Sequence, residues 1–307
     1  MILCFDIGGT SIKVAEAYAL EDVRPGERYP TPTDDFDAFA ATLSQTVARA
    51  STPPERIAIS IAGVVNPETG RATVANIPCL TGRQLVQDLT ERLQRPVDLA
   101  NDADCFALAE AFVGAGRGHD VVFGMILGTG VGGGVVVRGE LINASGGFAG
   151  EIGHGPVAPR IVGSPEVVLP AFPCGCGLSG CLDAVCSARG IERLHAYLAP
   201  GATASSVEIV AGWEEGKLPE SRTIDLWLDL LAGPLAMVEN MLGAGIIAVG
   251  GGLSNSNRLI AALDLAVRSR ILRRFDRPLV VPAACAIEPG LVGAAILGLR
   301  QHLKAAT

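Results

Sequence analysis

Three glycine turns, each directly after a short apolar run, limit most strongly how this chain can fold. They are Gly8, Gly9 and Thr10; Gly128, Thr129 and Gly130; and Gly250, Gly251 and Gly252. Glycine lets backbone N–H groups approach a phosphate without a Cβ in the way, and threonine adds a hydroxyl donor. One such turn alone is most simply an ordinary tight turn. Three of them, each at the end of an apolar strand, predict phosphate binding.

The sequence around these turns alternates between strand and helix patterns. Apolar, β-branched runs predict strands, and apolar residues at helical spacing predict helices. The expected strands are residues 2–7, 12–17, 57–65, 97–100, 121–127, 133–142, 246–252 with its glycine turn, and 279–283. The expected helices are residues 36–50, 83–93, 101–113, 223–242 with a kink at Pro234, 257–272 and 290–303. This alternation is typical of the α/β class.

Each half of the chain opens with two strands joined by a glycine turn, which predicts two similar α/β domains facing a cleft. A length of 307 residues is comfortable for two domains. We expect a smaller N-terminal domain over residues 1–115, with a C-terminal helix at about 290–307 packing back on it. A larger domain follows over residues 116–289, and residues 114–119 are the expected hinge.

Composition excludes several classes of protein. Hydrophobic residues make up 49% and charged residues 18%, so the chain is not intrinsically disordered. An excess of 32 acidic over 24 basic residues argues against binding a nucleic-acid backbone. The mean hydropathy is +0.38, but the uncharged run 121–137 holds six glycines and predicts two strands, not a membrane span. Asp6 comes too early for a signal peptide, so we expect a cytoplasmic protein without nucleic-acid or membrane partners.

Two common nucleotide-binding motifs do not fit. Gly128, Gly130 and Gly133 match the GxGxxG dinucleotide fingerprint, but the motif runs into a β-branched strand where that fingerprint should open a helix. The GxxxxGK[ST] motif of P-loop proteins does not occur in the sequence. The remaining expectation is a nucleotide held between strand hairpins.

Two carboxylates lie where such a nucleotide would need them. Asn101 and Asp102 follow the strand 97–100, and the simplest interpretation is a helix cap. In a functional role, the helix dipole would favour the ionised carboxylate of Asp102. That carboxylate would suffice for phosphoryl transfer, which needs positioning and late proton acceptance from a hydroxyl. Asp6, at the tip of the first hairpin, could help to place Mg²⁺.

A cluster of cysteines predicts a structural zinc site. Cys174, Cys176 and Cys181 lie within eight residues rich in glycine, and His154 lies 20 residues before them. Three thiolates and one imidazole complete a tetrahedral Zn²⁺ site with no open position. The alternatives are a metal-free loop or a redox pair. The remaining cysteines, Cys4, Cys79, Cys105, Cys186 and Cys285, show no ligand spacing and are expected to be small buried apolar residues.

Six motifs occur in an order that resembles the ROK family of sugar kinases and sugar-responsive repressors. They are DIGGTSIK (6–13), ANDADCFALAEA (100–111), LGTGVGGGVV (127–136), GEIGHGPV (150–157), CGCGLSGCLDA (174–184) and VGGGLSN (249–255). The likeness covers nearly the whole chain, and the CGCGxxGC element is its most specific part. Within the family, the bacterial N-acetylglucosamine kinases and fructokinases are the most similar.

The resemblance implies an actin-like ATPase fold of the hexokinase type, with ATP and a hexose between two α/β domains, and favours a homodimer. It implies that Asp102 is the catalytic base on the primary hydroxyl of the sugar. The implied sugar ligands are Asn76, Asn101, Asp102, Glu151, His154 and Asp183. The implied residues near ATP and Mg²⁺ are Asp6, Gly8, Gly9, Thr10, Lys13, Gly128, Thr129, Gly130, Gly250, Gly251 and Gly252. His154 would then serve both the zinc ion and the sugar.

Two departures from the family pattern qualify this expectation. Asp183 stands where the family usually has glutamate, and Glu288, Pro289 and Gly290 stand where it has Asp-Ala-Gly. The shorter side chain of Asp183 would bring the sugar closer, admit a bridging water or shift the preference among hexoses. The loops 30–35, 66–80 and 138–150 are expected to set the depth of the sugar pocket.

We expect an ATP-dependent kinase that converts N-acetyl-D-glucosamine to its 6-phosphate. Fructokinase or glucokinase activity is the alternative within the family. A repressor is disfavoured because the first hairpin begins at residue 2 and leaves no room for a preceding winged helix-turn-helix. A non-catalytic sugar sensor would be expected to lack Asp102, which is present. The hypothesis of a nicotinamide-dependent oxidoreductase is supported only by the GxGxxG motif.

Overall fold

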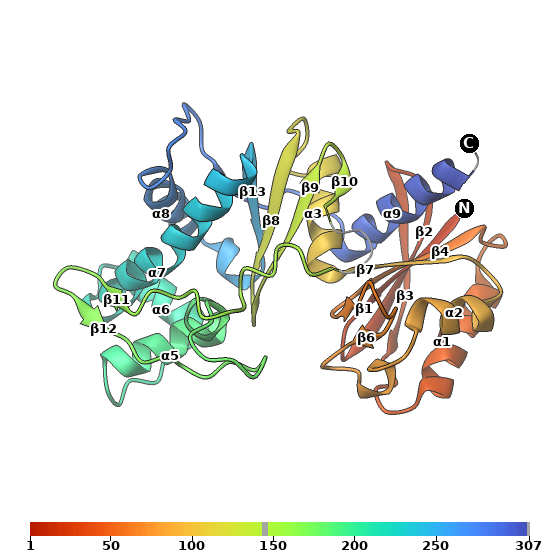
Figure 1. Ribbon diagram of the computed structural model, residues 1–307, viewed down its shortest axis with the longest axis horizontal. Coiled ribbons are helices and arrows are strands. Elements are labelled where there is room, and N and C mark those ends of the chain that lie inside the picture. Colours follow the sequence, from red (N-terminus) through yellow and green to blue (C-terminus); the bar gives the residue numbers. More distant parts are fainter. Residues whose placement is uncertain (143–146, 306–307) are drawn as a thin grey trace. The chain divides into compact units, whose positions relative to one another are not determined.

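The computed structural model describes residues 1–142 and 147–305 and divides into two compact units (Figure 1). The first unit comprises Met1–Gly114, Gly134–Ala149 and Cys285–Thr307, and the second comprises Ala115–Gly133 and Gly150–Ala284. Part of the predicted loop 138–150, namely residues 143–146, lies outside the described residues. The same is true of residues 306–307 at the end of the predicted last helix. No helix among the described residues is long and apolar enough to cross a membrane.

The first unit contains a five-stranded mixed sheet in the order β3-β2-β1-β4-β7. Its strands are β1 (Ile2–Ile7), β2 (Ser11–Ala19), β3 (Asp22–Pro30), β4 (Arg56–Ile61) and β7 (Val97–Asn101). β1 is antiparallel to β2 and parallel to β4, and β4 is parallel to β7. The helices of this unit are α1 (Phe36–Arg49), η1 (Pro78–Leu80), α2 (Leu85–Leu93), α3 (Asp102–Val113) and α9 (Pro289–Ala305).

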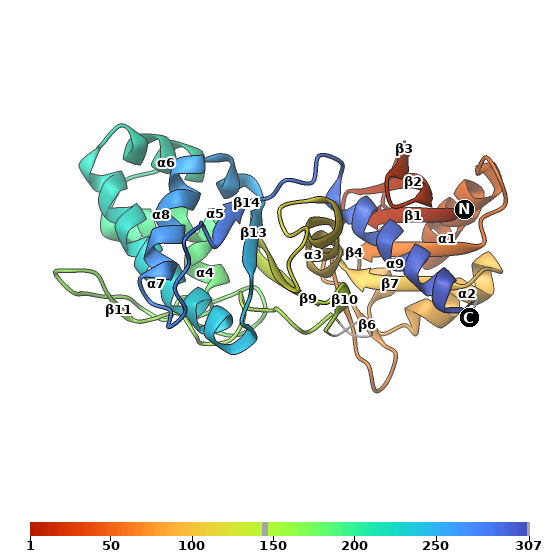
Figure 2. The ribbon, with the colours of Figure 1, turned by 90° about the horizontal axis from the view of Figure 1, so that it is seen from above.

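Both faces of this sheet are buried, because successive side chains along β1 point to opposite sides. Leu3, Phe5 and Ile7 belong to a core cluster that includes side chains from α1 and α2. Ile2 and Cys4 belong to a second cluster with Leu291, Ala294 and Ala295 of α9. Figure 2 shows α9 lying along β1 and β4. The last helix of the chain therefore completes the core of its first unit.

Two predicted strands were wrong in detail, and one strand was missed. The expected strand 57–65 ends at Ile61, because the chain bends at Gly63 into the short hairpin of β5 (Val64–Val65) and β6 (Ala72–Thr73). The expected strand 133–142 is divided at Arg138 and Gly139, whose positive φ angles make a tight turn. β3 was missed because it contains prolines, which an edge strand tolerates.

A second five-stranded sheet has the order β10-β9-β8-β13-β14. Its strands are β8 (Val121–Leu127), β9 (Val131–Val137), β10 (Glu140–Leu141), β13 (Ile246–Gly250) and β14 (Val280–Pro282). The boundary between the units falls within β9, and residues 134–149, which the sequence prediction placed in the second domain, group with the first unit. The backbone of Gly134 approaches that of Ala103 on α3 so closely that a Cβ on the glycine would lie 2.6 Å from the Ala103 carbonyl oxygen.

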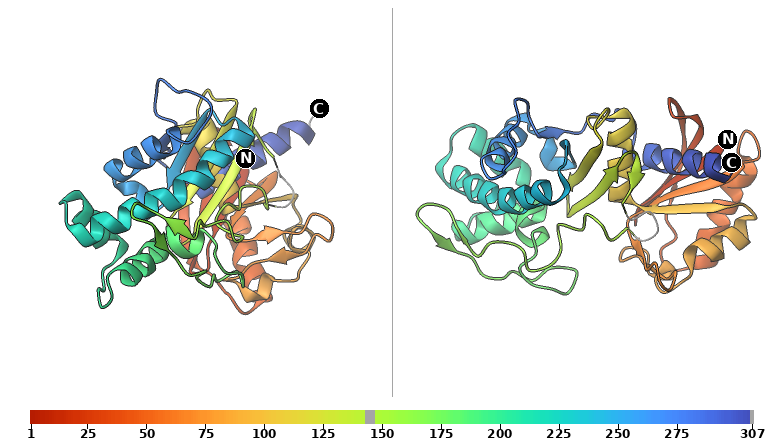
Figure 3. Two further views of the ribbon diagram at one scale, coloured as in Figure 1. Left: turned by 60° about the vertical axis from the view of Figure 1, so that its left-hand side comes forward. Right: turned by 45° about the horizontal axis from the view of Figure 1, so that its top comes forward.

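The helices of the second unit flank the strands β8, β13 and β14. They are α4 (Asp183–Cys186), α5 (Ala188–Leu198), α6 (Ser206–Glu214), α7 (Leu218–Leu242), η2 (Gly252–Asn255) and α8 (Asn257–Arg268). A small hairpin pairs β11 (Ile161–Val162) with β12 (Val167–Val168). Figure 3 shows α7 and α8 side by side. α7 begins five residues before the predicted helix and contains Pro234.

Candidate active site and metal centre

The carboxyl ends of three parallel strands line one edge of the sheet in the first unit. In the register of β1, β4 and β7, Ile7 pairs with Ile61, and Ile61 pairs with Asn101. The glycine turn after β1 and the start of α3 after β7 therefore lie at the same edge. In α/β proteins this edge is where ligands bind, because the loops that follow the strands gather there.

The first glycine turn is closed by its own backbone and packed against a neighbouring loop. The N–H of Gly8 donates to the carbonyl of Ser11 at 3.0 Å, and the Thr31 hydroxyl donates to the Gly8 carbonyl at 2.6 Å. A Cβ on Gly9 would lie only 2.8 Å from the Cβ of Asn76. The turn therefore requires glycine at this position, and the fold brings the predicted sugar ligand Asn76 beside it.

Lys13 lies in an acidic cluster directly after this turn. Its Nζ is 2.6 Å from Glu288 Oε1 and 3.2 Å from Asp6 Oδ2. Burial disfavours the charged ammonium, but the hydrogen bonds and charges of Glu288 and Asp6 outweigh burial and raise the pKa of Lys13. The Ser60 hydroxyl donates to Asp6 Oδ1 at 2.8 Å, so the Asp6 carboxylate is held between a cation and a hydroxyl. A Cβ on Gly290 would lie 2.3 Å from Asp6 Oδ1, so that glycine gives the carboxylate its space.

Asn101 and Asp102 form the start of α3. Asn101 caps the helix by accepting the Ala103 N–H at 2.8 Å, and its amide donates to the Gly63 carbonyl at 3.0 Å. The capping interpretation of Asn101 is therefore confirmed. Asp102 Oδ1 also accepts the Ala103 N–H, at 2.9 Å, which fixes the carboxylate over the first turn of the helix.

In the second unit the other two glycine turns lie in contact. β13 runs parallel to β8 with Gly250 opposite Ile126, so the turns that follow the two strands are neighbours. Gly251 has a φ of 89°, and a Cβ there would lie 2.5 Å from the Leu127 carbonyl and 2.8 Å from the Gly128 nitrogen. The fold therefore brings together two turns that are separated by more than one hundred residues.

A cavity of about 500 Å³ opens beside Gly252 within the second unit. Its lining is partly apolar, with Val207, Val210 and Leu253, and partly polar, with Ser256 and other side chains of η2, α6 and α8. The Ser256 hydroxyl donates to Glu214 Oε1 across the cavity wall. A lining that combines apolar side chains with a few polar groups is typical of a small-molecule binding pocket.

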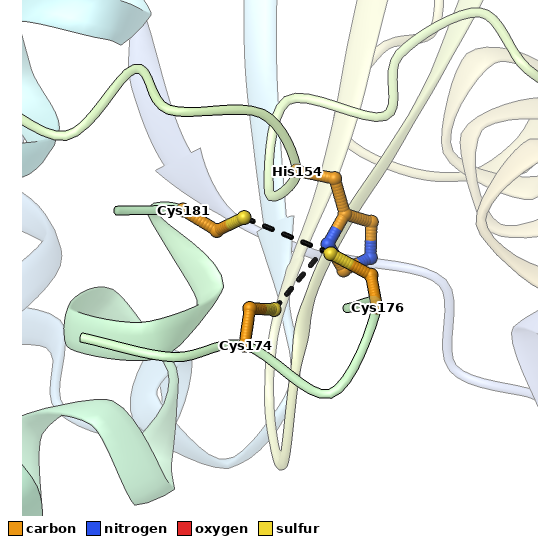
Figure 4. A group of neighbouring side chains, drawn as sticks. All are labelled: His154, Cys174, Cys176 and Cys181. Atoms are coloured by element: carbon orange, nitrogen blue, oxygen red, sulfur yellow. Dashed lines mark hydrogen bonds between the residues drawn. The ribbon is translucent and has the colours of Figure 1, made fainter. Parts of the chain in front are cut away.

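The four predicted zinc ligands come together in one cluster (Figure 4). Their ligand atoms all lie within 4.8 Å of one another. The Cys174 Sγ lies 3.7 Å from His154 Nδ1, and the Cys176 Sγ lies 3.7 Å from the Cys181 Sγ. A tetrahedral zinc site with usual bond lengths has ligand-to-ligand edges of about 3.6–3.8 Å. The donor set and these two distances are therefore compatible with a Zn²⁺ site.

The loop that carries the cysteines is shaped by glycine and by its own backbone. The Cys174 N–H donates to the Leu178 carbonyl at 2.8 Å, and the Gly177 N–H donates back to the Cys174 carbonyl at 3.1 Å. Gly177 and Gly180 have φ angles of 90° and 80°, which favour glycine. All eight cysteines are free thiols. Cys4, Cys105 and Cys186 are buried as expected, whereas Cys79 and Cys285 are only partly buried.

His154 presents its second ring nitrogen to Glu151. Nδ1 faces the cysteines, and Nε2 lies 3.9 Å from Glu151 Oε2, beyond direct hydrogen-bonding distance. Burial raises the pKa of Glu151, and the charge of His154 partly counteracts that shift.

Asp183 lies between the cysteine loop and the turn at Gly128. Its Oδ1 accepts the Val131 N–H at 2.8 Å, and its Oδ2 is 3.7 Å from the Cys174 Sγ. The sequence offered no sign of the contact between Asp183 and Val131, because the two residues are far apart along the chain. The same holds for Glu288 and Ser60, which were not predicted and which join Lys13 and Asp6.

Comparison with known proteins places the chain in a family. Residues 2–301 match the sequence model of the ROK family. The chain is 36% identical to the N-acetylgalactosamine kinase AgaK of Shewanella sp. (strain ANA-3), over 95% of each chain. It is 35% identical to the N-acetyl-D-glucosamine kinase of Pasteurella multocida (strain Pm70), over 97% of this chain and 99% of the relative. The crystal structure of a ROK hexokinase from Thermus thermophilus superposes with a TM-score of 0.83 at 28% identity, covering 99% of both chains.

The chain therefore belongs to the ROK family, as its motifs predicted. The predicted actin-like ATPase fold is confirmed as well.

Proposed function

We propose that this protein is an ATP-dependent sugar kinase that phosphorylates the primary hydroxyl of an N-acetylhexosamine, with N-acetyl-D-glucosamine as the preferred substrate. The observation that carries the proposal is the edge of the first sheet, where the glycine turn follows β1, Asp102 follows β7, and Lys13 lies near the start of β2. Phosphoryl transfer needs such a set, because it depends on charge compensation and on positioning of the hydroxyl.

In the first unit, Asp102 acts as the base that accepts the proton of the attacking hydroxyl. Its hydrogen bond from the Ala103 N–H holds the carboxylate in one orientation. Asn101 and Asn76 are proposed as sugar ligands, and Gly8, Gly9 and Thr10 are proposed to contact phosphate oxygens. The ammonium of Lys13 compensates negative charge on the transferred group.

In the second unit, Glu151 and the Nε2 of His154 bind sugar hydroxyls. The backbone of Gly128, Thr129 and Gly130 contacts the phosphates, and Gly250, Gly251 and Gly252 flank the adenosine. The cavity of about 500 Å³ beside Gly252 supports the adenosine assignment, since its lining is partly apolar and partly polar.

Two metal ions belong to this proposal. Asp6 is the candidate ligand for Mg²⁺, whose preference for oxygen donors it satisfies. His154, Cys174, Cys176 and Cys181 would hold a structural Zn²⁺, as their spacing supports. Mg²⁺ supplies charge neutralisation for the phosphates, and Zn²⁺ supplies a cross-link for the loop.

The sugar assignment follows the two relatives described above, which are named for N-acetylgalactosamine and N-acetyl-D-glucosamine. Both sugars carry an N-acetyl group and a primary hydroxyl, and they differ in the orientation of one ring hydroxyl. We also propose a homodimer in the cytoplasm, on the strength of the family resemblance. Light scattering coupled to size-exclusion chromatography checks the oligomeric state.

The test is release of ADP from Mg·ATP across a panel of sugars. The panel contains N-acetylglucosamine, N-acetylgalactosamine, N-acetylmannosamine, glucose, mannose, fructose and allose. We expect the largest kcat/KM with N-acetylglucosamine. The matched control is 6-deoxy-N-acetylglucosamine, which lacks the attacking hydroxyl and should inhibit without releasing ADP.

Silence across the panel, with sugar binding retained in calorimetry, would replace the kinase with a sugar sensor. A clear preference for N-acetylgalactosamine or for a sugar without the N-acetyl group would keep the kinase and change its substrate.

A further inference from the structure

Asp183 joins three segments of the second unit. Its Oδ1 accepts the Val131 N–H at 2.8 Å, directly after the turn of Gly128 to Gly130. Its own N–H donates to the Gly153 carbonyl at 2.9 Å, next to His154. Its carbonyl accepts the Ser187 hydroxyl at 2.7 Å, at the start of α5. A single residue therefore links the glycine turn, the segment that carries His154 and the helix that follows the cysteine loop.

Two glycines make this close approach possible. A Cβ on Gly130 would lie 2.9 Å from Asp183 Oδ1, so a side chain there would displace the carboxylate. A Cβ on Gly153 would lie 2.0 Å from the Val131 carbonyl oxygen, so the strand and the segment before His154 also touch through their backbones. The carboxylate occupies the space that the missing side chain of Gly130 leaves.

The cysteine loop lies next to Asp183 both in sequence and in space. Cys181 is two residues before Asp183, and the Ala184 N–H donates to the Cys181 carbonyl at 3.2 Å at the start of α4. The Cys174 Sγ is 3.7 Å from Asp183 Oδ2. One of the four candidate metal ligands therefore contacts the Asp183 carboxylate and another lies two residues before it, so a cation that holds these ligands would restrict the position of Asp183.

We propose that Asp183 is a positioning residue that holds the Gly128–Gly130 turn in place through the Val131 N–H and connects this turn to the metal-binding loop. It acts on the phosphate-binding turn and not as a ligand of the sugar. Only the kinetic test of this inference rests on the proposed kinase function. The hydrogen bond to Val131 can be measured in the protein without substrates.

The direct readout is the rate of hydrogen exchange at the Val131 amide, resolved by fragmentation mass spectrometry. Asp183→Ala should speed this exchange about tenfold, the effect of losing a hydrogen bond to a charged acceptor. Asp183→Asn keeps an acceptor oxygen and should retain most of the protection. The matched control is Asp229→Ala, because Asp229 Oδ2 also accepts a backbone N–H, that of Gly163, at 2.9 Å in the same unit. This control should speed exchange at Gly163 and leave Val131 unchanged.

The connection to the metal loop is tested by repeating the exchange measurement after chelation of the zinc. Chelation should speed exchange at Val131 in the wild type and add little in Asp183→Ala, whose link is already broken. An equal effect of chelation in both proteins would show that the loop reaches the turn by another route, and would overturn the connection.

Steady-state kinetics distinguishes a positioning role of Asp183 from a role as a sugar ligand. A positioning role predicts that Asp183→Ala raises the KM for MgATP about fivefold, with the KM for sugar within twofold and partial rescue in Asp183→Asn. A rise in the KM for sugar at unchanged KM for MgATP would make Asp183 a sugar ligand and overturn the inference. Loss of Val131 protection in a protein that phosphorylates no sugar would keep the inference and remove the proposed function.

Discussion

The glycine turns after β1 and after β8 are similar in their backbone but have different surroundings. Each follows the first strand of its sheet and leads into a neighbouring strand, and each is closed by a hydrogen bond from its first glycine N–H at 3.0 Å. Lys13 and Asp6 place charges directly beside the first turn. The second turn is bordered by Asp183 and, through it, by the cysteine cluster.

The comparison indicates that one backbone motif can serve two purposes, charge compensation in one unit and shape in the other. The first turn is bordered by the charged side chains of Lys13 and Asp6, to which we assign roles in charge compensation. The second turn is bordered by a loop that carries the candidate metal ligands, and we propose that its contribution is shape. Substitutions near the first turn should therefore change reaction rate and phosphate affinity, and changes near the second should first change local stability.

The largest expected effect is on the side of the first turn, at Asp102. Asp102→Ala should lower kcat about 10³-fold, because a positioned base contributes roughly 10²–10⁴. The KM for sugar should change much less. Steady-state ADP release measures both, with Asp37→Ala as the control, an exposed carboxylate at the start of α1. Turnover near the wild-type rate in Asp102→Ala would remove this residue from the mechanism.

Lys13→Met and Thr129→Val compare the two turns directly. Loss of the ammonium should raise the KM for MgATP at least tenfold, because hydrogen bonds to charged groups are worth about 1.5–3 kcal/mol. Loss of the Thr129 hydroxyl should raise the KM for MgATP only about fivefold, because a neutral hydrogen bond contributes roughly 1 kcal/mol. Equal effects of the two substitutions would mean that the turns do not divide charge and shape between them.

Removal of zinc should act on the second turn alone. Cys176→Ser or chelation should lower Tm by about 10 °C, which corresponds to roughly 4 kcal/mol of lost metal binding. Hydrogen exchange should increase over β8 and β9 and stay unchanged over β1 and β2. Elemental analysis establishes the metal content, and Cys79→Ser serves as a thiol control outside the cluster. Fully active, stable protein without zinc would contradict the bracing role.

The smallest effect concerns the ion pair of Lys13 with Glu288. Because these partners raise the folded-state pKa of Lys13, the pair stabilises the fold fully below about pH 10.5. That contribution is lost as pH rises through the higher folded value. A double-mutant cycle of Lys13→Met and Glu288→Gln should give about 0.5–1 kcal/mol at pH 8, since both side chains are partly exposed. Urea unfolding should show the coupling disappear well above pH 10.5, and coupling that grows with pH would be inconsistent with this pair.

The sequence predicted those parts of the molecule that depend on neighbours along the chain. The start of α3 at Asn101 was predicted because the cap, the helix and the preceding strand are contiguous. The cluster of His154 with three cysteines was predicted because the cysteines lie in one short loop. Family resemblance added the order of the motifs and hence the fold.

Contacts between distant segments could not be predicted. Glu288 is far from Lys13 in sequence, and its departure from the family pattern gave no sign that it forms an ion pair. Asp183 was expected to contact the sugar, and the Val131 N–H that it accepts became visible only in three dimensions. Individual residue roles in catalysis stay predictions for the experiments above.

The position of α9 has a consequence for the order in which the protein can be made. Its side chains Leu291, Ala294 and Ala295 cover the face of the first sheet that carries Ile2 and Cys4. On the ribosome, β1 to β7 emerge long before this helix, and at roughly 5–20 residues per second the delay is about ten seconds or more. During that interval the second unit is synthesised, and the apolar sheet face that α9 will cover stays exposed. This stage of synthesis is where we expect chaperones to engage the nascent chain.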